Sequence, residues 1–319
     1  MKGPVRTGVI GVGYIGKFHA DKFSTAADSQ LTSVVDIDQD QCKAVAQKLG
    51  VNHCTDYRSI LPYVDAVSVA TPPHLHYEMT KFFLENGKHV LTEKPFTEKL
   101  DEADELIHLA ERKGLILQVG HIERFNPAFL TAKPYIHQPI FIEATRCAPY
   151  SLRGADVSVV FDLMIHDIDL VLNLNNSPLS DVSAVGACIC SDNIDIANAR
   201  LTFTNGCIAD ITASRIGYES TRTMIVTQNE SSCELDFQNK TVTGSTILYN
   251  NTACYNNERY ENTAKNHDML FCEIESFIHS ITSGKPSVVS GHDGRFALDI
   301  ALKINSSIES SLCNHAAIR

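Results

Sequence analysis

The chain has 319 residues, and its 38 acidic and 27 basic side chains give a formal net charge of −11. This length predicts about two domains, each large enough for its own core. The negative balance disfavours nucleic acid as a partner, and an anionic substrate would need a local basic pocket. No stretch of eighteen residues lacks charge and no apolar run of signal-peptide type is present, so we expect a cytoplasmic protein without a membrane span.

Strand-like and helical runs alternate in the first part of the chain. Helical runs follow Gly16 up to Phe23 and cover residues 75–86 and 100–113, and apolar strand-like runs end at Ile10 and cover residues 31–35, 66–70, 89–92 and 115–119. Such alternation predicts an α/β domain with a parallel, doubly wound sheet. We assign residues 1–122 to this domain.

After residue 140 short strand-like runs replace the alternation. They cover residues 140–146, 182–190, 199–203, 207–214, 223–227 and 232–237. Asn205-Gly206 between two runs is a hairpin signal, and residues 269–283 and 296–312 have helical patterns. The polar stretch 250–262 is interpreted as a loop. The pattern predicts an α+β domain with a largely antiparallel sheet over residues 123–319.

Residues 157–174 form a nearly apolar run with one polar stripe. At 100° per residue on a helix, Asp162, His166, Asp169 and Asn173 project within about 60° of one another, with Ser158 at the edge. A helix that is apolar on its other sides must be buried, and burying unpartnered carboxylates costs several kcal/mol. The stripe therefore predicts a polar cavity, and the alternative is an internal hydrogen bond between Asp162 and His166.

The N-terminal strand is followed by a dinucleotide-binding signature. Gly11, Gly13 and Gly16 form G-x-G-x-x-G, and Asp36 ends the next strand twenty residues after Gly16. The glycines allow a tight turn and close backbone approach, the helix N-terminus takes a pyrophosphate, and the acid binds ribose hydroxyls. The two residues after Asp36 are not basic, so we expect NAD rather than NADP.

Four motifs in order resemble the glucose-fructose oxidoreductase, inositol dehydrogenase and rhizopine-catabolism (Gfo/Idh/MocA) family. They are the glycine signature with its acid, ATPPHLH at residues 70–76, GKHVLTEKP at 87–95, and D-x-x-x-H-x-x-D at 162–169. The resemblance covers essentially the whole chain. It implies a Rossmann domain followed by an open-faced antiparallel sheet, and NAD- or NADP-dependent oxidation or reduction of a sugar carbon. Met164 departs from the glycine that the family often has there, which puts the shape of the neighbouring pocket in doubt.

The resemblance implies that Lys94, Asp162 and His166 form a catalytic trio. Independently, hydride removal from an alcohol needs a base for the hydroxyl proton, and an imidazole with a pKa near 6.5 suits neutral pH. His166 is therefore the candidate base, and Asp162 can fix its tautomer. Lys94 follows a strand that should end beside the cofactor, where it can polarise the reacting oxygen. The alternative for Lys94 is a solvated surface lysine.

The cofactor site is expected to include further residues around these motifs. They are Tyr14, Ile15, Ile37, Ala70, Thr71, Pro72, His76 and Glu93. His74 and His76 either touch the cofactor or cap the helix that begins near Leu75. Tyr14 either lies on the nicotinamide side of the phosphates or packs locally.

The substrate is less defined by the sequence. Residues 118–127 and 162–169 resemble the subgroup of the family that includes UDP-N-acetylglucosamine 3-dehydrogenases. A diphosphate needs cations, and Arg124, Arg146 and Arg153 are candidates, although each can equally be solvated or ion-paired. Further expected substrate contacts are Lys94, His121, His166 and Asp169.

Two other functions stay open from the sequence alone. One is a polyol or free-sugar dehydrogenase such as an inositol dehydrogenase, and the other is a non-catalytic NAD-binding regulator, against which the trio argues. An open sheet would expose a large apolar face, so we expect a homodimer or homotetramer through that sheet.

The cysteines predict neither a disulfide framework nor a zinc site. Ten are scattered along the chain without a C-x-x-C pair, which indicates reduced thiols. Cys188 and Cys190 are interpreted as one face of a strand.

Overall fold

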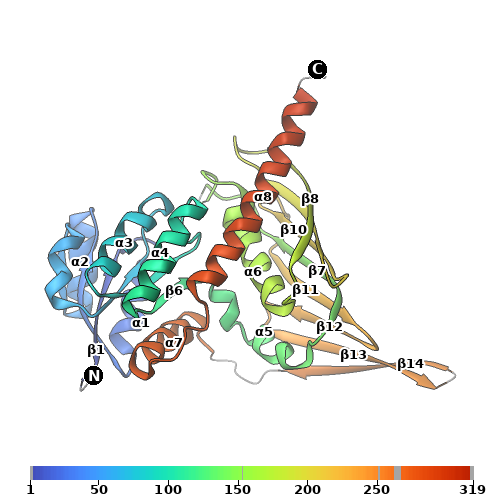
Figure 1. The fold of residues 1–319 in the computed structure, drawn as a ribbon, viewed down its shortest axis with the longest axis horizontal. Helices are drawn as coiled ribbons and strands as arrows, with labels where there is room; N and C mark the ends of the chain where they lie inside the picture. The colour runs from blue at the N-terminus through green and yellow to red at the C-terminus, as the bar shows by residue number, and fades with distance from the viewer. Residues whose placement is uncertain (1–2, 153, 251, 262–266, 317–319) are drawn as a thin grey trace. The chain divides into compact units, whose positions relative to one another are not determined.

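The computed structural model describes residues 3–152, 154–250, 252–261 and 267–316. The chain divides into two compact units, Met1–Ile122 with Asp268–Arg295, and Glu123–His267 with Phe296–Arg319 (Figure 1). The expected division of 1–122 and 123–319 therefore differs from the structure for Asp268–Arg295. The reason is packing, because Phe277 of α7 (Met269–Ser283) makes an edge contact with Phe23 of α1 (Gly16–Thr25) at 6.5 Å between ring centroids.

The first unit contains the predicted parallel sheet, which has six strands; the short third strand was not predicted. Its strands are β1 (Val5–Ile10), β2 (Ser29–Val35), β3 (Asn52–Cys54), β4 (Ala66–Val69), β5 (His89–Glu93) and β6 (Leu117–Gly120), and their order is β3-β2-β1-β4-β5-β6. The order reverses between β1 and β4, which is where doubly wound sheets bind ligands at the carboxyl ends of their strands.

Helices connect these strands, and all but the one at 39–49 lie where the sequence predicts a helix. They are α1, α2 (Gln39–Leu49), α3 (His76–Glu85) and α4 (Leu100–Lys113). The bounds of α4 agree with the prediction because its signals are local: acids at 101 and 102, bases at 112 and 113, and Gly114 with a φ of +63° at its end. The 3₁₀ turns 57–63 (η1) and 73–75 (η2) complete the connections.

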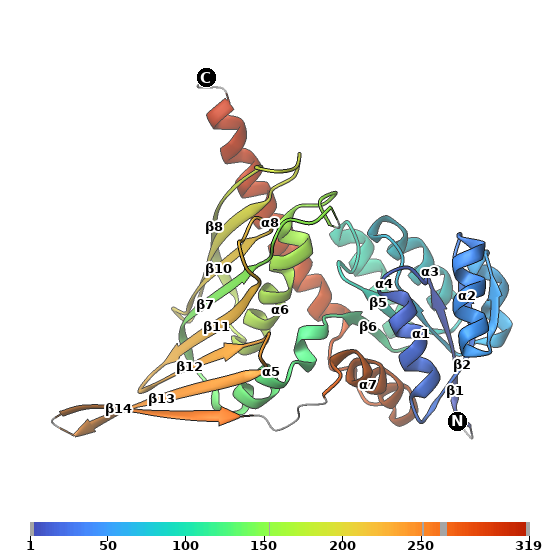
Figure 2. The same ribbon diagram turned by 180° about the vertical axis from the view of Figure 1, so that it is seen from behind.

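The second unit contains an eight-stranded mixed sheet. Its strands are β7 (Pro139–Cys147), β8 (Leu179–Ala187), β9 (Ile196–Phe203), β10 (Ile208–Ser214), β11 (Thr221–Gln228), β12 (Ser231–Asp236), β13 (Thr241–Asn250) and β14 (Thr252–Glu261). The order is β14-β13-β12-β11-β7-β10-β9-β8, and all pairs are antiparallel except β10 with β7. The α+β domain with a mainly antiparallel sheet is confirmed (Figures 1 and 2).

Two local predictions in this sheet are wrong. Residues 250–262 were expected as a loop, but Thr252–Glu261 forms β14, which pairs with β13; residues 251 and 262 lie outside the described residues. A strand at the edge of a sheet can be held by backbone hydrogen bonds alone, so a polar edge strand lacks the apolar pattern from which strands are predicted. Cys188 and Cys190 follow the end of β8 at Ala187 instead of sharing its face, and both are exposed.

Helices cover one face of this sheet and form the core of the unit with it. The main ones are α6 (Ile165–Leu174), α8 (Gly291–Ala316) and the short α5 (Pro127–Ala132), with 3₁₀ turns at 122–125 (η3) and 133–135 (η4) (Figure 2). Ile168 of α6, Ile304 of α8, and Ile142 and Ile211 of the sheet are fully buried in one apolar cluster. This packing holds residues 157–174 against the sheet.

The other face of the sheet, expected from the sequence to be apolar, carries polar pairs along β9 and β10. Arg200 forms two hydrogen bonds to Asp210, of 2.8 and 2.7 Å, and Asn198 donates to Thr212 at 2.9 Å. Alternation of buried apolar and exposed polar residues is the usual pattern for an antiparallel sheet with one solvated face. The described helices include none that is long and apolar enough to cross a membrane.

Candidate active site

The turn after β1 has the geometry of a dinucleotide-binding loop. Gly11 has a φ of +80°, and a Cβ there would lie 2.7 Å from the carbonyl oxygen of Ala70. A Cβ on Gly16 would overlap the carbonyl of Gly11, whereas a Cβ on Gly13 would meet nothing within 4 Å. No side chain caps the start of α1, with Ile15 at its N-cap. The open space at Gly13 beside an uncapped helix N-terminus fits the pyrophosphate of NAD.

Asp36 lies at the end of β2 beside this turn. Its Oδ2 accepts a hydrogen bond from the backbone N–H of Val12 at 2.8 Å, and its Oδ1 accepts one from the N–H of Asp38 at 2.9 Å. The neighbouring Ile37 side chain is 90 % exposed. The carboxylate is thus held at the glycine turn, where it fits ribose hydroxyls and would repel a 2′-phosphate. Tyr14 on the same turn is mostly exposed and contacts Phe18 edge-on.

His76 connects two loops at the carboxyl edge of this sheet. Its Nδ1 lies 2.8 Å from the carbonyl oxygen of Pro95, and its Nε2 lies 2.9 Å from that of Thr71. Burial is the main influence on this imidazole and lowers its pKa. His76 therefore connects the loop containing Thr71 and Pro72 to the turn after Lys94. The sequence had suggested a cofactor contact or a helix cap for this residue, and not this connection.

Glu93 ends β5, and Lys94 follows it. Glu93 Oε1 lies 3.0 Å from Nε2 of His19, whose Nδ1 lies 2.8 Å from the hydroxyl of Ser68. Burial raises the pKa of Glu93, but the hydrogen bond and charge of His19 outweigh it, so the net pKa is lowered. A Cβ on Gly120 would lie 2.9 Å from this carboxylate, so only glycine leaves it room. Glu93, expected at the cofactor, thus has a partner within the fold.

Glu273 of α7 brings a second carboxyl group to the same place. It is fully buried, and neither carboxyl oxygen has a hydrogen-bond partner. Burial and the nearby charge of Glu93 raise its pKa well above the usual value. One ligand-type atom each of His19, Glu93 and Glu273 lie within 4.8 Å of one another, a spacing at which a cation can be held. A proton on Glu273 balances the charge equally well.

Sequence reasoning did not identify His19, Ser68 or Glu273. One signal was available for His19, since it lies three residues after Gly16 on α1 and so shares a helix face with the glycine turn. Glu273 had no such signal, because a single acid in an amphipathic helix looks the same whether it faces water or a buried carboxylate.

In the second unit the striped segment is not one regular α-helix. Val160–Met164 forms a π-helical turn and α6 begins at Ile165, so the spacing of 100° per residue does not hold across Asp162. π-turns within helices occur frequently at functional sites. Asp162 and His166 are both half-buried, and Val160, Met164 and Ile165 beside them are fully buried. Met164 is one of these buried residues, so it packs in the core of the unit.

Two expected substrate contacts, Arg124 and Asp169, bind each other. Arg124 donates to both oxygens of Asp169 at 2.6 and 2.7 Å, and their side chains are 4 % and 1 % exposed. Arg146 is likewise buried and binds Asp167 at 2.8 Å twice and Glu123 at 2.9 Å. Neither arginine is an open phosphate site, because both guanidinium groups already face carboxylates. The sequence could not show which charges pair internally.

The remaining expected substrate contacts lie in different places. His121 is buried directly after β6 in the first unit. Arg153 lies outside the described residues. The cofactor turn and Lys94 thus lie in the first unit, and Asp162 and His166 lie in the second.

Family models match both units. A model of the oxidoreductase family with an NAD-binding Rossmann fold matches residues 5–121, and the Gfo/Idh/MocA C-terminal domain model matches residues 146–233. This chain belongs to the Gfo/Idh/MocA family. It is therefore an NAD-dependent oxidoreductase, and the glycine turn and Asp36 described above are the parts of the family's nucleotide-binding fold that the structure places together.

Relatives within the Gfo/Idh/MocA family match over nearly the whole chain. UDP-N-acetylglucosamine 3-dehydrogenase of Acidithiobacillus ferrooxidans is 37 % identical over 97 % of this chain and 98 % of its own. A solved structure of that enzyme has a TM-score of 0.90 at 36 % identity, covering 96 % and 98 % of the two chains. Myo-inositol 2-dehydrogenase of Thermotoga maritima is 28 % identical over 96 % of each chain. Levoglucosan dehydrogenase in complex with NADH, at 21 % identity and a TM-score of 0.87 over 96 % and 97 % of the chains, shares the fold.

Proposed function

We propose that this chain is a UDP-N-acetylglucosamine 3-dehydrogenase, which oxidises the C3 hydroxyl of the sugar to a ketone with NAD. The observation that carries the proposal is the 37 % identity over nearly the full length with an enzyme of that name. Inositol dehydrogenases are more distant, at 28 and 26 % identity, so a polyol substrate is the second candidate.

In the proposed mechanism His166 accepts the hydroxyl proton while the hydrogen on C3 leaves with its electron pair. Nicotinamide, when bound, supplies the acceptor for that hydride. Asp162 orients the imidazole and stabilises its protonated form, and Lys94 stabilises negative charge that develops on the reacting oxygen. His19, itself held by Ser68, binds Glu93 and thereby fixes the end of β5 from which Lys94 extends.

For the nucleotide part, we propose that Arg153 binds the diphosphate, since Arg124 and Arg146 face carboxylates. His121 is retained as a proposed substrate contact. The Arg124–Asp169 pair instead holds η3 against α6 within the second unit, and so supports the helix that carries His166.

The experiment measures NADH formation from NAD with UDP-N-acetylglucosamine, myo-inositol or glucose, in the presence of hydroxylamine to trap a ketone product. Of these three substrates, we expect only UDP-N-acetylglucosamine to be oxidised. Lys94→Ala and His166→Ala should each lower kcat by roughly a hundredfold or more, the scale for loss of an acid–base group. The exposed Lys48 and His108 serve as controls, and their alanine variants should keep wild-type rates.

Oxidation of myo-inositol or glucose in place of the nucleotide sugar would move the proposal to the second candidate. Tight NADH binding without turnover of any substrate would favour a regulatory protein built on the same fold.

We also propose a cytoplasmic homodimer or homotetramer. The eight cysteines whose side chains the structure describes are all free thiols, which suits a reducing compartment. Assembly through the open sheet would use the face opposite the helices, and light scattering coupled to gel filtration tests the oligomeric state.

A further inference from the structure

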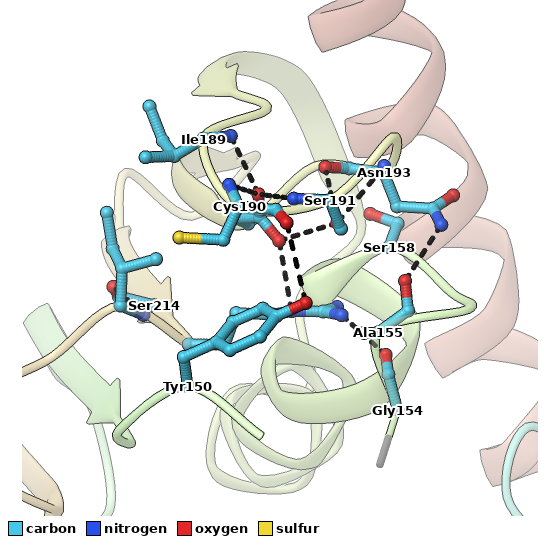
Figure 3. Close-up of polar contacts among 12 residues, drawn as sticks. Tyr150, Gly154, Ala155, Ser158, Ile189, Cys190, Ser191, Asn193 and Ser214 are labelled. Atoms are coloured by element: carbon cyan, nitrogen blue, oxygen red, sulfur yellow. Dashed lines mark hydrogen bonds and ion pairs between the residues drawn. The ribbon is translucent and has the colours of Figure 1, made fainter. Parts of the chain in front are cut away.

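The segment from Gly154 to Ser158 leads into the turn that carries Asp162, and three of its backbone carbonyls accept hydrogen bonds from side chains of other segments. Figure 3 labels two of these three residues, Gly154 and Ala155. Arg215 donates from Nη1 to the carbonyl of Gly154 and from Nη2 to that of Val157, each at 2.5 Å. Asn193 donates to the carbonyl of Ala155 at 3.0 Å. One guanidinium group thus bridges two points of this segment.

Arg215 is itself fixed by a buried carboxylate. It follows the end of β10 and is 4 % exposed. Its backbone N–H donates to the carbonyl of Asp195 at 2.9 Å, and its Nε lies 3.7 Å from Asp195 Oδ1. The guanidinium group therefore has little freedom to move away from the two carbonyls.

The Asp195 carboxylate is held by the turn after β8. It accepts hydrogen bonds from the backbone N–H groups of Ile189, Cys190 and Ser191 and from the hydroxyl of Ser191 (Figure 3). Burial opposes ionisation, but these donors lower the pKa of Asp195 to about 2. The carboxylate stays charged at neutral pH and compensates the buried charge of Arg215.

Gly154, which Arg215 holds, packs directly against Asp162. Its φ is +79°, and a Cβ at this position would lie 2.6 Å from Oδ2 of Asp162. The backbone of Gly154 therefore lies against this carboxylate and limits where it can move. The other end of the segment is also connected to Asp162, whose N–H donates to the carbonyl of Ser158 at 3.1 Å.

We propose that Arg215 is a positioning residue, which fixes the segment around Gly154 and thereby sets the place of the Asp162 carboxylate relative to His166. The effect on turnover rests on the proposed function, because it assumes that Asp162 and His166 act in the reaction. The geometric claim concerns only the second unit and does not depend on the substrate.

The first experiment exchanges Arg215 for lysine. Arg215→Lys keeps the charge that compensates Asp195, but an ammonium group cannot reproduce the planar fork that reaches both carbonyls. With UDP-N-acetylglucosamine and NAD, kcat should fall by about tenfold to a hundredfold, the scale for displacement of a catalytic group by about 1 Å. The Kd for NADH, measured by fluorescence, should stay within twofold. The matched control is Arg295→Lys, which alters a similar two-point contact with Asp104 in the first unit and should change neither quantity.

The second measurement needs no substrate. The titration of the His166 imidazole is followed by NMR in wild type, Asp162→Asn and Arg215→Lys, with His166→Ala to assign the signal. If Arg215 places Asp162, the His166 pKa in Arg215→Lys should move from the wild-type value toward that of Asp162→Asn. Titration identical to wild type in the folded variant would overturn the proposal. The titration tests the placement of Asp162 whether or not the wild type oxidises the nucleotide sugar. Failure to oxidise that sugar would refute the proposed function and leave the proposal about Arg215 intact.

A glycine pair keeps the proposal testable if Arg215→Lys does not fold. Gly154→Ala puts a methyl group against the Asp162 carboxylate, whereas Gly206→Ala introduces the same kind of strain, at a φ of +87°, where nothing lies within 4 Å. We expect Gly154→Ala to lower kcat and shift the His166 titration, and Gly206→Ala to do neither. Equal behaviour of the two variants would show that the segment does not control Asp162.

Discussion

Replacing Asp169 with asparagine should destabilise the second unit strongly, because Asp169 forms a buried pair with Arg124. The two hydrogen bonds are 2.6 and 2.7 Å long, and the side chains are 4 % and 1 % exposed. Removing one partner of a buried pair leaves the other charge uncompensated, which costs about 3–5 kcal/mol. At about 1.4 kcal/mol per tenfold change, this raises the unfolding equilibrium constant by roughly two to three and a half powers of ten.

The chain contains a solvent-exposed ion pair with the same two-point geometry, which serves as a control. Arg200 binds Asp210 at 2.8 and 2.7 Å, but these side chains are 56 % and 24 % exposed. Solvent screening reduces the value of such a pair to about 0–1 kcal/mol. Asp210→Asn should therefore be nearly neutral, although the hydrogen bonds are similar.

Urea unfolding followed by circular dichroism compares wild type, Asp169→Asn and Asp210→Asn. We expect a large drop in the midpoint for the first variant and a small one for the second. Similar midpoints for both variants would refute the argument from burial. Preserved stability of Asp169→Asn together with weaker binding of the nucleotide sugar would support the direct substrate contact that the sequence predicted.

Three further predictions follow from the nucleotide turn, the buried acid and the proposed diphosphate contact. Asp36→Ala should weaken NADH binding and bring the affinities for NADH and NADPH closer together, as measured by fluorescence titration. Equal affinities of the wild type for the two cofactors would contradict the role of this carboxylate. Because the folded-state pKa of Glu273 is raised from 4.5, its protonated form stabilises the fold at low pH and this contribution is lost as pH rises through the folded-state pKa. In wild type, Tm should therefore fall as the pH rises through this pKa, and Glu273→Gln should reduce that fall. If the slope of Tm against pH is the same in both proteins, Glu273 does not titrate in this pH range. Arg153→Ala should raise KM for the nucleotide sugar with less change in kcat, since a diphosphate is bound equally in the ground and transition states; steady-state kinetics with unaltered KM would exclude this contact.

The sequence by itself determined the features that depend on neighbouring residues. The bounds of α4 and α7 agree with the predicted helices at 100–113 and 269–283, because periodicity and terminal residues are local signals. The glycine turn with Asp36 was also predictable, since the spacing of its glycines and of the acid is a pattern within one short stretch of the chain. The family followed from the order of such motifs along the chain.

Only the tertiary structure decided which charged residues face one another. Arg124 and Asp169 lie 45 residues apart, and nothing in their local patterns distinguishes an internal pair from a substrate contact. The same holds for Glu273 beside Glu93, and for Arg215, which reaches carbonyls 61 and 58 residues away. Periodicity reports which side of an element is buried, whereas partner choice depends on how distant segments meet, and that is settled by packing of the whole unit.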